Sequence, residues 1–195
     1  MIPDSGFAVS VAQFLAAPLV VGSPFPSSAS MVRRLFAKLP WTQIDTLVEF
    51  GPGSGTFTRF ALKHLRADAR LIAIDTEQRF TEHLKRKIRD RRLVAVTGSA
   101  RDVHAIVKAH GRTRIDCVVS GLPFSTLDDA DREAIVSRSA AMMGCSGIFL
   151  AYQMRRAIEP HLQRAFVTLE RRHHWLNAPP CYLYRATRPR SVRRT

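Results

Sequence analysis

The amino-acid sequence predicts an α/β fold in which helices cover both faces of a mostly parallel, seven-stranded sheet. Short apolar runs alternate with helical segments from Thr46 to Tyr152, which is the order of parallel strands joined by crossover helices. The runs are apolar along their whole length, as is typical of strands buried on both faces. Two more apolar runs near the end predict an antiparallel C-terminal hairpin. The 195 residues fit one domain with a substantial core.

The individual elements follow from apolar periodicity and from residues that cap or break helices. A first helix is expected from Ala29 to Leu39, because Ser27 or Ser28 can cap it. The expected strands span residues 46–50, 71–74, 93–97, 115–120, 148–152, 167–172 and 181–185. The expected helices between them run to Leu65, to about Arg89, near 103–109 and near 128–142.

Residues 1–28 precede this domain and contain an apolar stripe at helical spacing from Phe7 to Leu15, ended by Pro18. A signal peptide would carry basic residues before its apolar stretch, whereas the first basic residue here is Arg33. A membrane span would need about 20 apolar residues, and polar residues interrupt this stretch. We therefore expect a cytoplasmic protein.

The chain is strongly basic, with a formal net charge of +14 and a sequence pI near 11.1. A field of that sign attracts anionic partners, either nucleic acid or acidic lipid, and charge alone does not choose between them. Basic residues concentrate in two segments, 79–92 and 155–195. The last residues, 188–195, are predicted to form a basic disordered tail.

No metal site or disulfide framework is expected. Cys117, Cys145 and Cys181 are widely spaced and have no histidine at ligand spacing, so we interpret them as buried free thiols. His173 and His174 are adjacent, and neighbours in a strand point to opposite faces, so they could not easily share one ion. We interpret them as surface histidines or as hydrogen-bonded core histidines.

The segment from Glu49 to Gly55 closes the first expected strand with the sequence E-F-G-P-G-S-G. Its glycines permit positive φ and close approach of a ligand, and open α/β sheets bind ligands beyond the carboxyl ends of their strands. Asp75 ends the second strand, where a carboxylate can accept hydrogen bonds from a ribose diol. A dinucleotide enzyme is disfavoured, because the loop lacks G-x-G-x-x-G spacing and Glu49 would repel a phosphate but attract a cationic amino-acid group.

Together, E-F-G-P-G-S-G and the I-A-I-D strand resemble the signature of class I S-adenosylmethionine-dependent methyltransferases, which have a Rossmann-like fold. The resemblance implies that Glu49 and the glycine loop hold the methionine part of S-adenosylmethionine and that Asp75 holds its ribose. The turn at Ser99 would face the adenine, and S-adenosylhomocysteine would be the product. The donor-binding residues implied in this way are Glu49, Gly51, Gly53, Gly55, Thr56, Asp75, Thr76, Ser99, Ala100 and Ser120.

The fourth strand ends in S-G-L-P-F, which begins at Ser120, where a methyl acceptor must arrive. Adenine dimethyltransferases of ribosomal RNA resemble this pattern but begin it with an asparagine, whereas Ser120 offers only a hydroxyl. This form, with residues 21–28 upstream and 175–185 downstream, resembles bacterial phospholipid N-methyltransferases over roughly residues 14–186. One departure is that residues 1–32 contain no Lys or Arg, which docking helices of that family usually carry.

The resemblance implies an enzyme that methylates phosphatidylethanolamine successively toward phosphatidylcholine, bound peripherally at the inner face of the cytoplasmic membrane. It implies a membrane-docking helix and substrate lid in residues 1–28 and a methyltransferase domain in 29–187, followed by the tail. Anionic membrane lipids are the expected partners of the basic chain, nucleic acid is a disfavoured one, and a monomer is expected. The alternatives left open are methylation of RNA adenine, methylation of another amine such as that of ornithine lipid, and nucleic-acid binding without catalysis.

Methyl transfer to an amine requires no dedicated strong base. A deprotonated amine attacks the activated methyl group in line, so positioning and desolvation supply most of the rate. The backbone carbonyl near Ser120 would orient the amine. The residues expected to arrange the acceptor are Ser120, Gly121, Leu122 and Tyr152. The candidates for an aromatic wall that stabilises the developing cation are Phe124, Tyr152, Trp175 and Tyr182.

Overall fold

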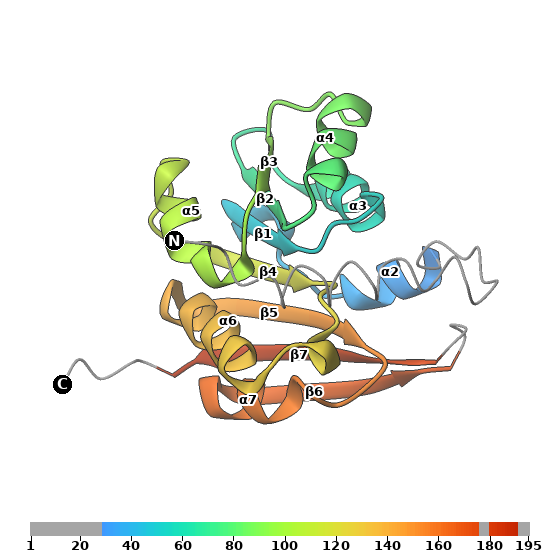
Figure 1. Cartoon of the computed structure of the whole chain (residues 1–195), viewed down its shortest axis with the longest axis vertical. Helices are drawn as coiled ribbons and strands as arrows, with labels where there is room; N and C mark the ends of the chain where they lie inside the picture. Colours follow the sequence, from blue (N-terminus) through green and yellow to red (C-terminus); the bar gives the residue numbers. More distant parts are fainter. Residues whose placement is uncertain (1–28, 176–179, 191–195) are drawn as a thin grey trace.

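The computed structural model describes residues 29–175 and 180–190, and within them the strands form a single seven-stranded sheet (Figure 1). The strands are β1 (Thr46–Phe50), β2 (Arg70–Asp75), β3 (Leu93–Thr97), β4 (Ile115–Ser120), β5 (Met143–Gln153), β6 (Phe166–His174) and β7 (Cys181–Pro189). Their order is β3-β2-β1-β4-β5-β7-β6; β1 to β5 pair in parallel, and β7 pairs antiparallel with both β5 and β6. The predicted α/β fold, with a mostly parallel sheet and a C-terminal antiparallel hairpin, is confirmed.

Helices cover both faces of this sheet in the described part of the chain, as predicted (Figure 1). One face carries α2 (Ala29–Leu35), α3 (Thr56–His64) and α4 (Gln78–Lys87), and the other carries α5 (Val103–Ala109), α6 (Asp129–Ala141) and α7 (Glu159–Ala165). The short 3-10 turns are η1 (Trp41–Gln43), η2 (Ala100–Asp102) and η3 (Phe124–Thr126). In β1, Leu47 packs into one apolar cluster and Val48 into the other, and both are fully buried. Burial on both faces explains why the central strands are apolar along their whole length.

Several predicted boundaries differ from the observed ones. Helix α2 ends at Leu35 rather than at Leu39, because the chain turns at Lys38, whose φ is +64°. Strand β5 begins at Met143 rather than at residue 148. Strand β7 continues to Pro189, because pairing with β6 extends the ladder beyond the apolar run. Arg188 and Pro189 therefore belong to the sheet and not to the predicted disordered tail.

The sequence pattern does not indicate helix α7, because this seven-residue helix lacks a long apolar stripe. Its first residue, Glu159, is 7% exposed and accepts hydrogen bonds from Arg156, Arg171 and Tyr184 at 2.8–3.0 Å. The bond from Arg156, together with those from Arg171 and Tyr184, lowers the pKa of Glu159 to about 2 although partial burial opposes the shift. Arg171 and Tyr184 lie on β6 and β7, so tertiary contacts rather than local propensity place this helix.

Cys117 and Cys181 are buried as expected, but Cys145 is exposed. The prediction for Cys145 is wrong because β5 is irregular at its start: the pairing with β4 passes from Met143 directly to Ile148, which leaves the residues between them out of the ladder.

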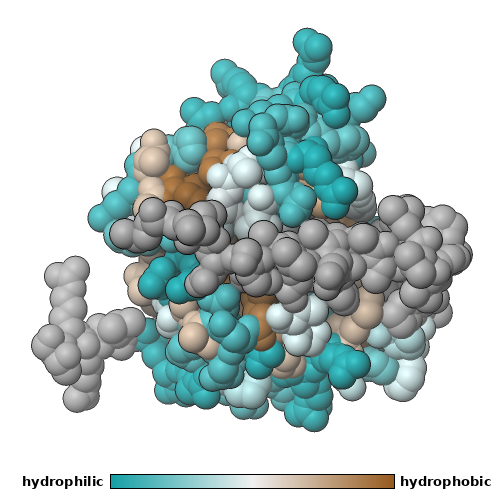
Figure 2. Space-filling view, in the orientation of Figure 1, coloured by the Kyte–Doolittle hydropathy of each residue, from teal (hydrophilic) through white to brown (hydrophobic). Residues whose placement is uncertain are grey.

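The first basic segment, residues 79–92, forms α4 and the loop after it. Figure 2 shows a hydrophilic surface at the top of the molecule, where Figure 1 places α4. Lys85, Arg86 and Lys87 are exposed at its last turn, so this charge is solvated.

The predicted docking helix from Phe7 to Leu15 and the rest of residues 1–28 lie outside the described residues. Within residues 29–175 and 180–190, no helix combines the length and apolar character that crossing a membrane requires.

Candidate active site

The carboxyl ends of β1 and β4 form the centre of the candidate site. The sheet continues through β2 and β3 on one side of this pair and through β5 on the other, which makes it a topological switch point where open α/β sheets bind ligands. The Gly121 amide donates to the Phe50 carbonyl at 2.8 Å, and the Gly51 amide donates to the Ile74 carbonyl at 3.0 Å. The two loops that the sequence singled out therefore start side by side.

The glycine loop after β1 has backbone angles that residues with side chains rarely adopt. The φ values are +66° at Gly51, +51° at Gly53 and +82° at Gly55. A Cβ at Gly55 would lie 2.6 Å from the Leu84 side chain, and one at Gly51 would lie 3.2 Å from the Leu122 side chain. A Cβ at Gly53 would meet nothing within 4 Å. Gly53 thus leaves open space beside the backbone, where a ligand can approach.

Glu49 is the penultimate residue of β1 and is 2% exposed. Its carboxylate accepts a hydrogen bond from the Thr58 hydroxyl of α3 at 2.6 Å. Burial raises the pKa of Glu49 to about 7, the Thr58 bond partly opposes the shift, and the nearby Asp75 carboxylate adds to it. A cationic ligand group next to Glu49 would stabilise its ionised form. The sequence did not single out Thr58, whose role depends on how α3 packs against β1.

Asp75 ends β2 and is 3% exposed. One carboxylate oxygen accepts a hydrogen bond from the Glu77 amide at 3.0 Å, whereas the other has no partner within the described residues. The buried hydroxyl of Thr76 also lacks one there. Burial raises the pKa of Asp75 to about 6, against backbone hydrogen bonds from Glu77 and Gly53. Because buried polar groups without partners are costly, Asp75 and Thr76 fit a ligand that brings hydroxyl groups, such as a ribose.

The other residues predicted for the donor site are less open to a ligand. The Ser99 hydroxyl accepts a hydrogen bond from the Arg101 amide at 3.2 Å and so caps η2. Ala100 is 4% exposed and its side chain packs in the core, so it can offer only backbone groups. Thr56 begins α3, with its hydroxyl 3.3 Å from that of Ser54.

A residue that the sequence did not single out holds the S-G-L-P-F loop. Gln153, the last residue of β5, accepts a hydrogen bond from the Phe124 amide at 3.2 Å and donates one to the Leu122 carbonyl at 2.7 Å. Gln153 is 5% exposed, so its side chain supplies the partners that water would otherwise provide. Ser120 is fully buried, with its hydroxyl 3.4 Å from the Leu122 amide. A polar residue at the carboxyl end of a central strand is the sequence signal that would have indicated Gln153.

The residues predicted to arrange the acceptor lie together. A Cβ at Gly121 would lie 2.6 Å from the Tyr152 hydroxyl and 3.0 Å from the Gly51 carbonyl oxygen, so only glycine fits between them. The Tyr152 ring stacks on Phe57 of α3 with 4.9 Å between centroids and 15° between planes. The structure thus brings Gly121 and Tyr152 next to the glycine loop, with Ser120 and Leu122 on either side of Gly121.

The remaining candidates for an aromatic wall lie in different surroundings. Phe124 is fully buried in the apolar core and is a packing residue, which removes it from the candidates for an aromatic wall. Trp175 is 73% exposed and meets the edge of His173 at 3.7 Å between centroids. Tyr182 lies 4.8 Å from His173 on the other strand of the hairpin. Tyr152 lies against Gly121 of the loop formed by residues 120–124, which we call the acceptor loop.

The two adjacent histidines of β6 have different surroundings. His173 contacts aromatic rings, whereas His174 is 1% exposed and neither of its ring nitrogens has a partner within the described residues. His174 is therefore not the hydrogen-bonded core histidine that we expected. In residues 29–175 and 180–190, no group of three His, Cys, Asp or Glu side chains is placed to hold a metal ion.

Replacing Gln153 by alanine should lower the free energy of unfolding by about 1–3 kcal/mol, because two buried backbone groups of the acceptor loop lose their partner. Urea denaturation followed by circular dichroism measures the change. Gln163→Ala, on the exposed surface of α7, is the matched control and should change stability little. Equal stabilities for the two variants would contradict the role of Gln153.

Solved structures of methyltransferases share this fold. A precorrin-6y C5,15-methyltransferase from Geobacter metallireducens superposes with a TM-score of 0.63 at 14% identity, covering 86% of this chain and 92% of that chain. A TehB-like SAM-dependent methyltransferase from Corynebacterium glutamicum superposes with a TM-score of 0.58 at 14% identity, covering 95% of this chain and 100% of that chain. These similarities confirm the Rossmann-like methyltransferase fold.

A sequence relative has a more specific description. The ornithine lipid N-methyltransferase of Singulisphaera acidiphila is 29% identical over 118 residues, which are 60% of this chain and 62% of that protein. The aligned region thus spans less than two thirds of the relative.

Residues 47–147 match the sequence family described as methyltransferase domain. The matched region begins in β1 and ends in β5, and it contains the glycine loop, Asp75 and the acceptor loop after β4. The match covers more than half of the 195 residues. The chain therefore belongs to the methyltransferase domain family.

Proposed function

We propose that the chain is an S-adenosylmethionine-dependent N-methyltransferase that methylates the amine of phosphatidylethanolamine successively toward phosphatidylcholine. It works as a monomer at the inner face of the cytoplasmic membrane. The observation that carries the proposal is the packing of Gly121 of the acceptor loop against Gly51 of the glycine loop, beside the buried carboxylates of Glu49 and Asp75. The relative from Singulisphaera acidiphila, described as acting on a lipid amine, supports this acceptor class.

The glycine loop and the two carboxylates bind the donor. S-adenosylmethionine supplies a methyl group activated by its positive sulfur. Glu49 attracts the amino group of the donor. The Asp75 oxygen that has no partner within the described residues accepts a hydrogen bond from the ribose diol, and the Thr76 hydroxyl can donate a bond to the diol or accept one from it. Gly53 leaves room for the donor beside the backbone. Ser99 and Ala100 border the adenine through the backbone of η2.

The acceptor loop positions the amine for an in-line attack. Its neighbours Ser120, Tyr152 and Gln153 have no side chain that is a strong base, so the ammonium loses its proton to water before transfer. The backbone near Ser120 and Gly121 orients the amine, and Gln153 keeps this backbone in place. The Tyr152 ring is placed to stabilise the positive charge that accumulates on the nitrogen.

Methylation of ornithine lipid is the second candidate function, and the relative with that description favours it. Both lipids present a small ammonium group at a membrane surface. The proposal for RNA adenine has less support, because the acceptor loop begins with Ser120 rather than an asparagine.

Asp75→Asn should weaken binding of S-adenosylmethionine by about 1–3 kcal/mol, because the ribose hydroxyls lose a charged acceptor while the amide can keep the bond from Glu77. Isothermal titration calorimetry measures the dissociation constant. Asp68→Ala, which removes an exposed carboxylate before β2, at the opposite end of that strand from Asp75, is the control and should bind the donor normally. Unchanged affinity in Asp75→Asn would remove Asp75 from the donor site.

Donor affinity should fall as the pH is lowered through about 7, because Glu49, whose pKa is about 7, must lose its proton to bind a cationic amino group. The expected slope is about tenfold per pH unit, and it should steepen below about 6, where Asp75 also takes up a proton. Glu49→Gln should bind more weakly at neutral pH and show a much smaller slope than the wild type between about 6 and 7, because only Asp75 still titrates there. Calorimetric titrations across about pH 5 to 8 test this. A wild-type affinity that is independent of pH would show that Glu49 does not bind the cationic amino group.

Purified protein incubated with methyl-labelled S-adenosylmethionine and phosphatidylethanolamine vesicles should yield labelled mono-, di- and trimethylated lipid, resolved by thin-layer chromatography. Parallel reactions with ornithine lipid vesicles and with ribosomal RNA fragments identify the acceptor, and reactions without protein give the background. Label in ornithine lipid alone would establish the second candidate. Label in RNA alone would overturn the proposal for a lipid acceptor.

A further inference from the structure

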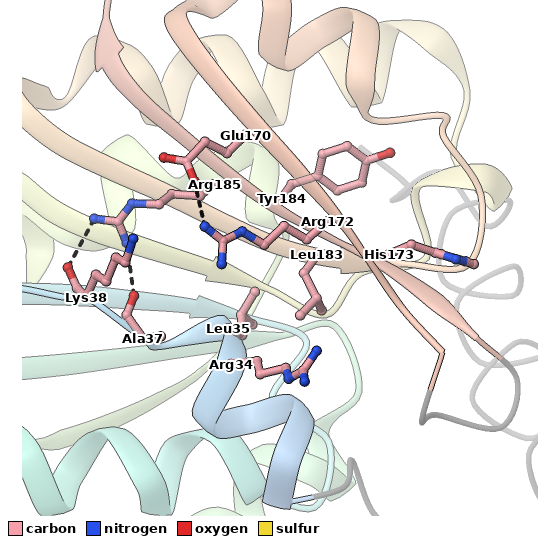
Figure 3. A pocket seen from close by; sticks show the side chains of 10 residues that line it. All are labelled: Arg34, Leu35, Ala37, Lys38, Glu170, Arg172, His173, Leu183, Tyr184 and Arg185. Carbon is pink, nitrogen blue, oxygen red and sulfur yellow. Dashed lines mark hydrogen bonds and ion pairs between the residues drawn. The ribbon is translucent and has the colours of Figure 1, made fainter.

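A groove of about 320 Å³ lies between the end of α2 and the β6–β7 hairpin, away from the methyl-transfer site (Figure 3). Helix α2 contributes one wall, and the side chains of the hairpin that face α2 contribute the other. The residues that line it are Arg34, Leu35, Ala37, Lys38, Glu170, Arg172, His173, Leu183, Tyr184 and Arg185. Glu49, Asp75 and Ser120 do not contribute to this lining, so the groove is a separate feature of the molecule.

The groove carries four cationic side chains and one carboxylate. Arg185 donates to the carbonyls of Ala37 and Lys38 at 3.5 and 3.2 Å, and so binds the end of α2. Arg172 and Glu170 form an exposed ion pair at 3.4 Å, which is worth little in water. Figure 3 shows the Arg34 side chain without a marked interaction. The side chains that line the groove therefore carry more positive than negative charge.

The side chains of Arg34 and Lys38 form no hydrogen bond or ion pair within the described residues. The positive charge of Arg34 acts on His174. Burial is the main cause that lowers the pKa of His174, and the nearby arginine lowers it further. Lys38 occupies a position with φ of +64°, which glycine adopts at lower cost. A lysine there brings a charge to the groove that the turn does not require.

The floor of the groove is aliphatic. Leu35 is 4% exposed and Leu183 is 7% exposed, and both belong to the apolar cluster under α2. Tyr184 is 1% exposed, so its ring offers no open face on which a nucleic-acid base could stack. A cationic rim over an aliphatic floor fits a phosphate that carries a hydrocarbon chain better than it fits a nucleic acid.

We propose that this groove is a second binding site, which takes the phosphate headgroup of an anionic membrane phospholipid. Arg34, Lys38 and Arg172 contact the phosphate, and Leu35 and Leu183 contact the carbons next to it. The inference rests on the proposed function in that it names a membrane lipid as the occupant. It adds an attachment site that recognises acidic lipid independently of the amine that is methylated.

Sedimentation with vesicles of phosphatidylcholine, with and without phosphatidylglycerol, tests the site in the full chain without donor or acceptor lipid. Arg34→Gln combined with Arg172→Gln should weaken binding to acidic vesicles by about tenfold or more. Lys85→Gln combined with Arg86→Gln removes the same charge from the exposed end of α4 and should weaken it by less than about threefold. Equal losses in both double variants, or none in the groove variant, would overturn the proposal.

Lys38→Gly is a second variant, and it should not destabilise the fold because glycine adopts the positive φ at this position without strain. It should unfold at the same temperature as the wild type or higher, yet bind acidic vesicles several-fold more weakly. If this variant and the groove double variant both bound acidic vesicles as tightly as the wild-type protein does, the proposed site would be overturned.

Titration with inorganic phosphate and with a short-chain, water-soluble phosphatidylglycerol separates the two sources of a phosphate group. The soluble lipid should bind more tightly than inorganic phosphate and should lose affinity in the groove double variant. Equal affinity for both would assign the groove to free phosphate instead of lipid. These measurements involve no methyl transfer, so a failure of phosphatidylethanolamine methylation would not affect them.

Discussion

The close approach of the loops after β1 and β4 is the constraint on which the proposed chemistry depends. A Cβ at Gly121 would lie 3.0 Å from the Gly51 carbonyl oxygen, and a Cβ at Gly51 would press on Leu122. Two glycines thus let the loops after β1 and β4, which we propose bind the donor and the acceptor, approach each other closely. In-line transfer needs the two reacting groups within van der Waals distance, and the strand order of the parallel sheet brings the two loops together.

Two buried carboxylates lie at the same end of the sheet, where their charge is unfavourable. Glu49 and Asp75 are both almost fully buried, and burial raises the pKa of each. A sequence selected for stability alone would have apolar residues at positions 49 and 75, like the apolar residues that fill most of β1 and β2. Ligand groups that complete the hydrogen bonds of Asp75 and neutralise Glu49 would relieve this cost, so the energy that destabilises the free protein contributes to selective binding.

The sequence predicted the strands, the glycine loop and the polar strand ends because each has a local signature. Asp75 and Glu49 were identifiable since a carboxylate at the end of an apolar strand is conspicuous. Helix α7 and Thr58 were not, because their roles depend on partners 9 to 25 residues away. Gln153 has a local signal, since it is a polar residue at the end of a central strand, but its role depends on partners 29 and 31 residues away. The sequence left the role of Phe124 open for the same reason: an aromatic residue after a strand has the same local pattern whether it faces a ligand or packs in the core.

Strand β6 ends the sheet on the hairpin side, and most of its residues are exposed. An exposed edge has unpaired backbone groups that can recruit a strand from another molecule. Here Glu170, Arg171 and Arg172 follow one another along that edge. A second copy that added its own β6 in either direction would bring a cluster of arginines against another cluster, with the cost of removing them from water. The charge of this edge therefore opposes sheet extension and protects a basic protein from aggregating through its own backbone.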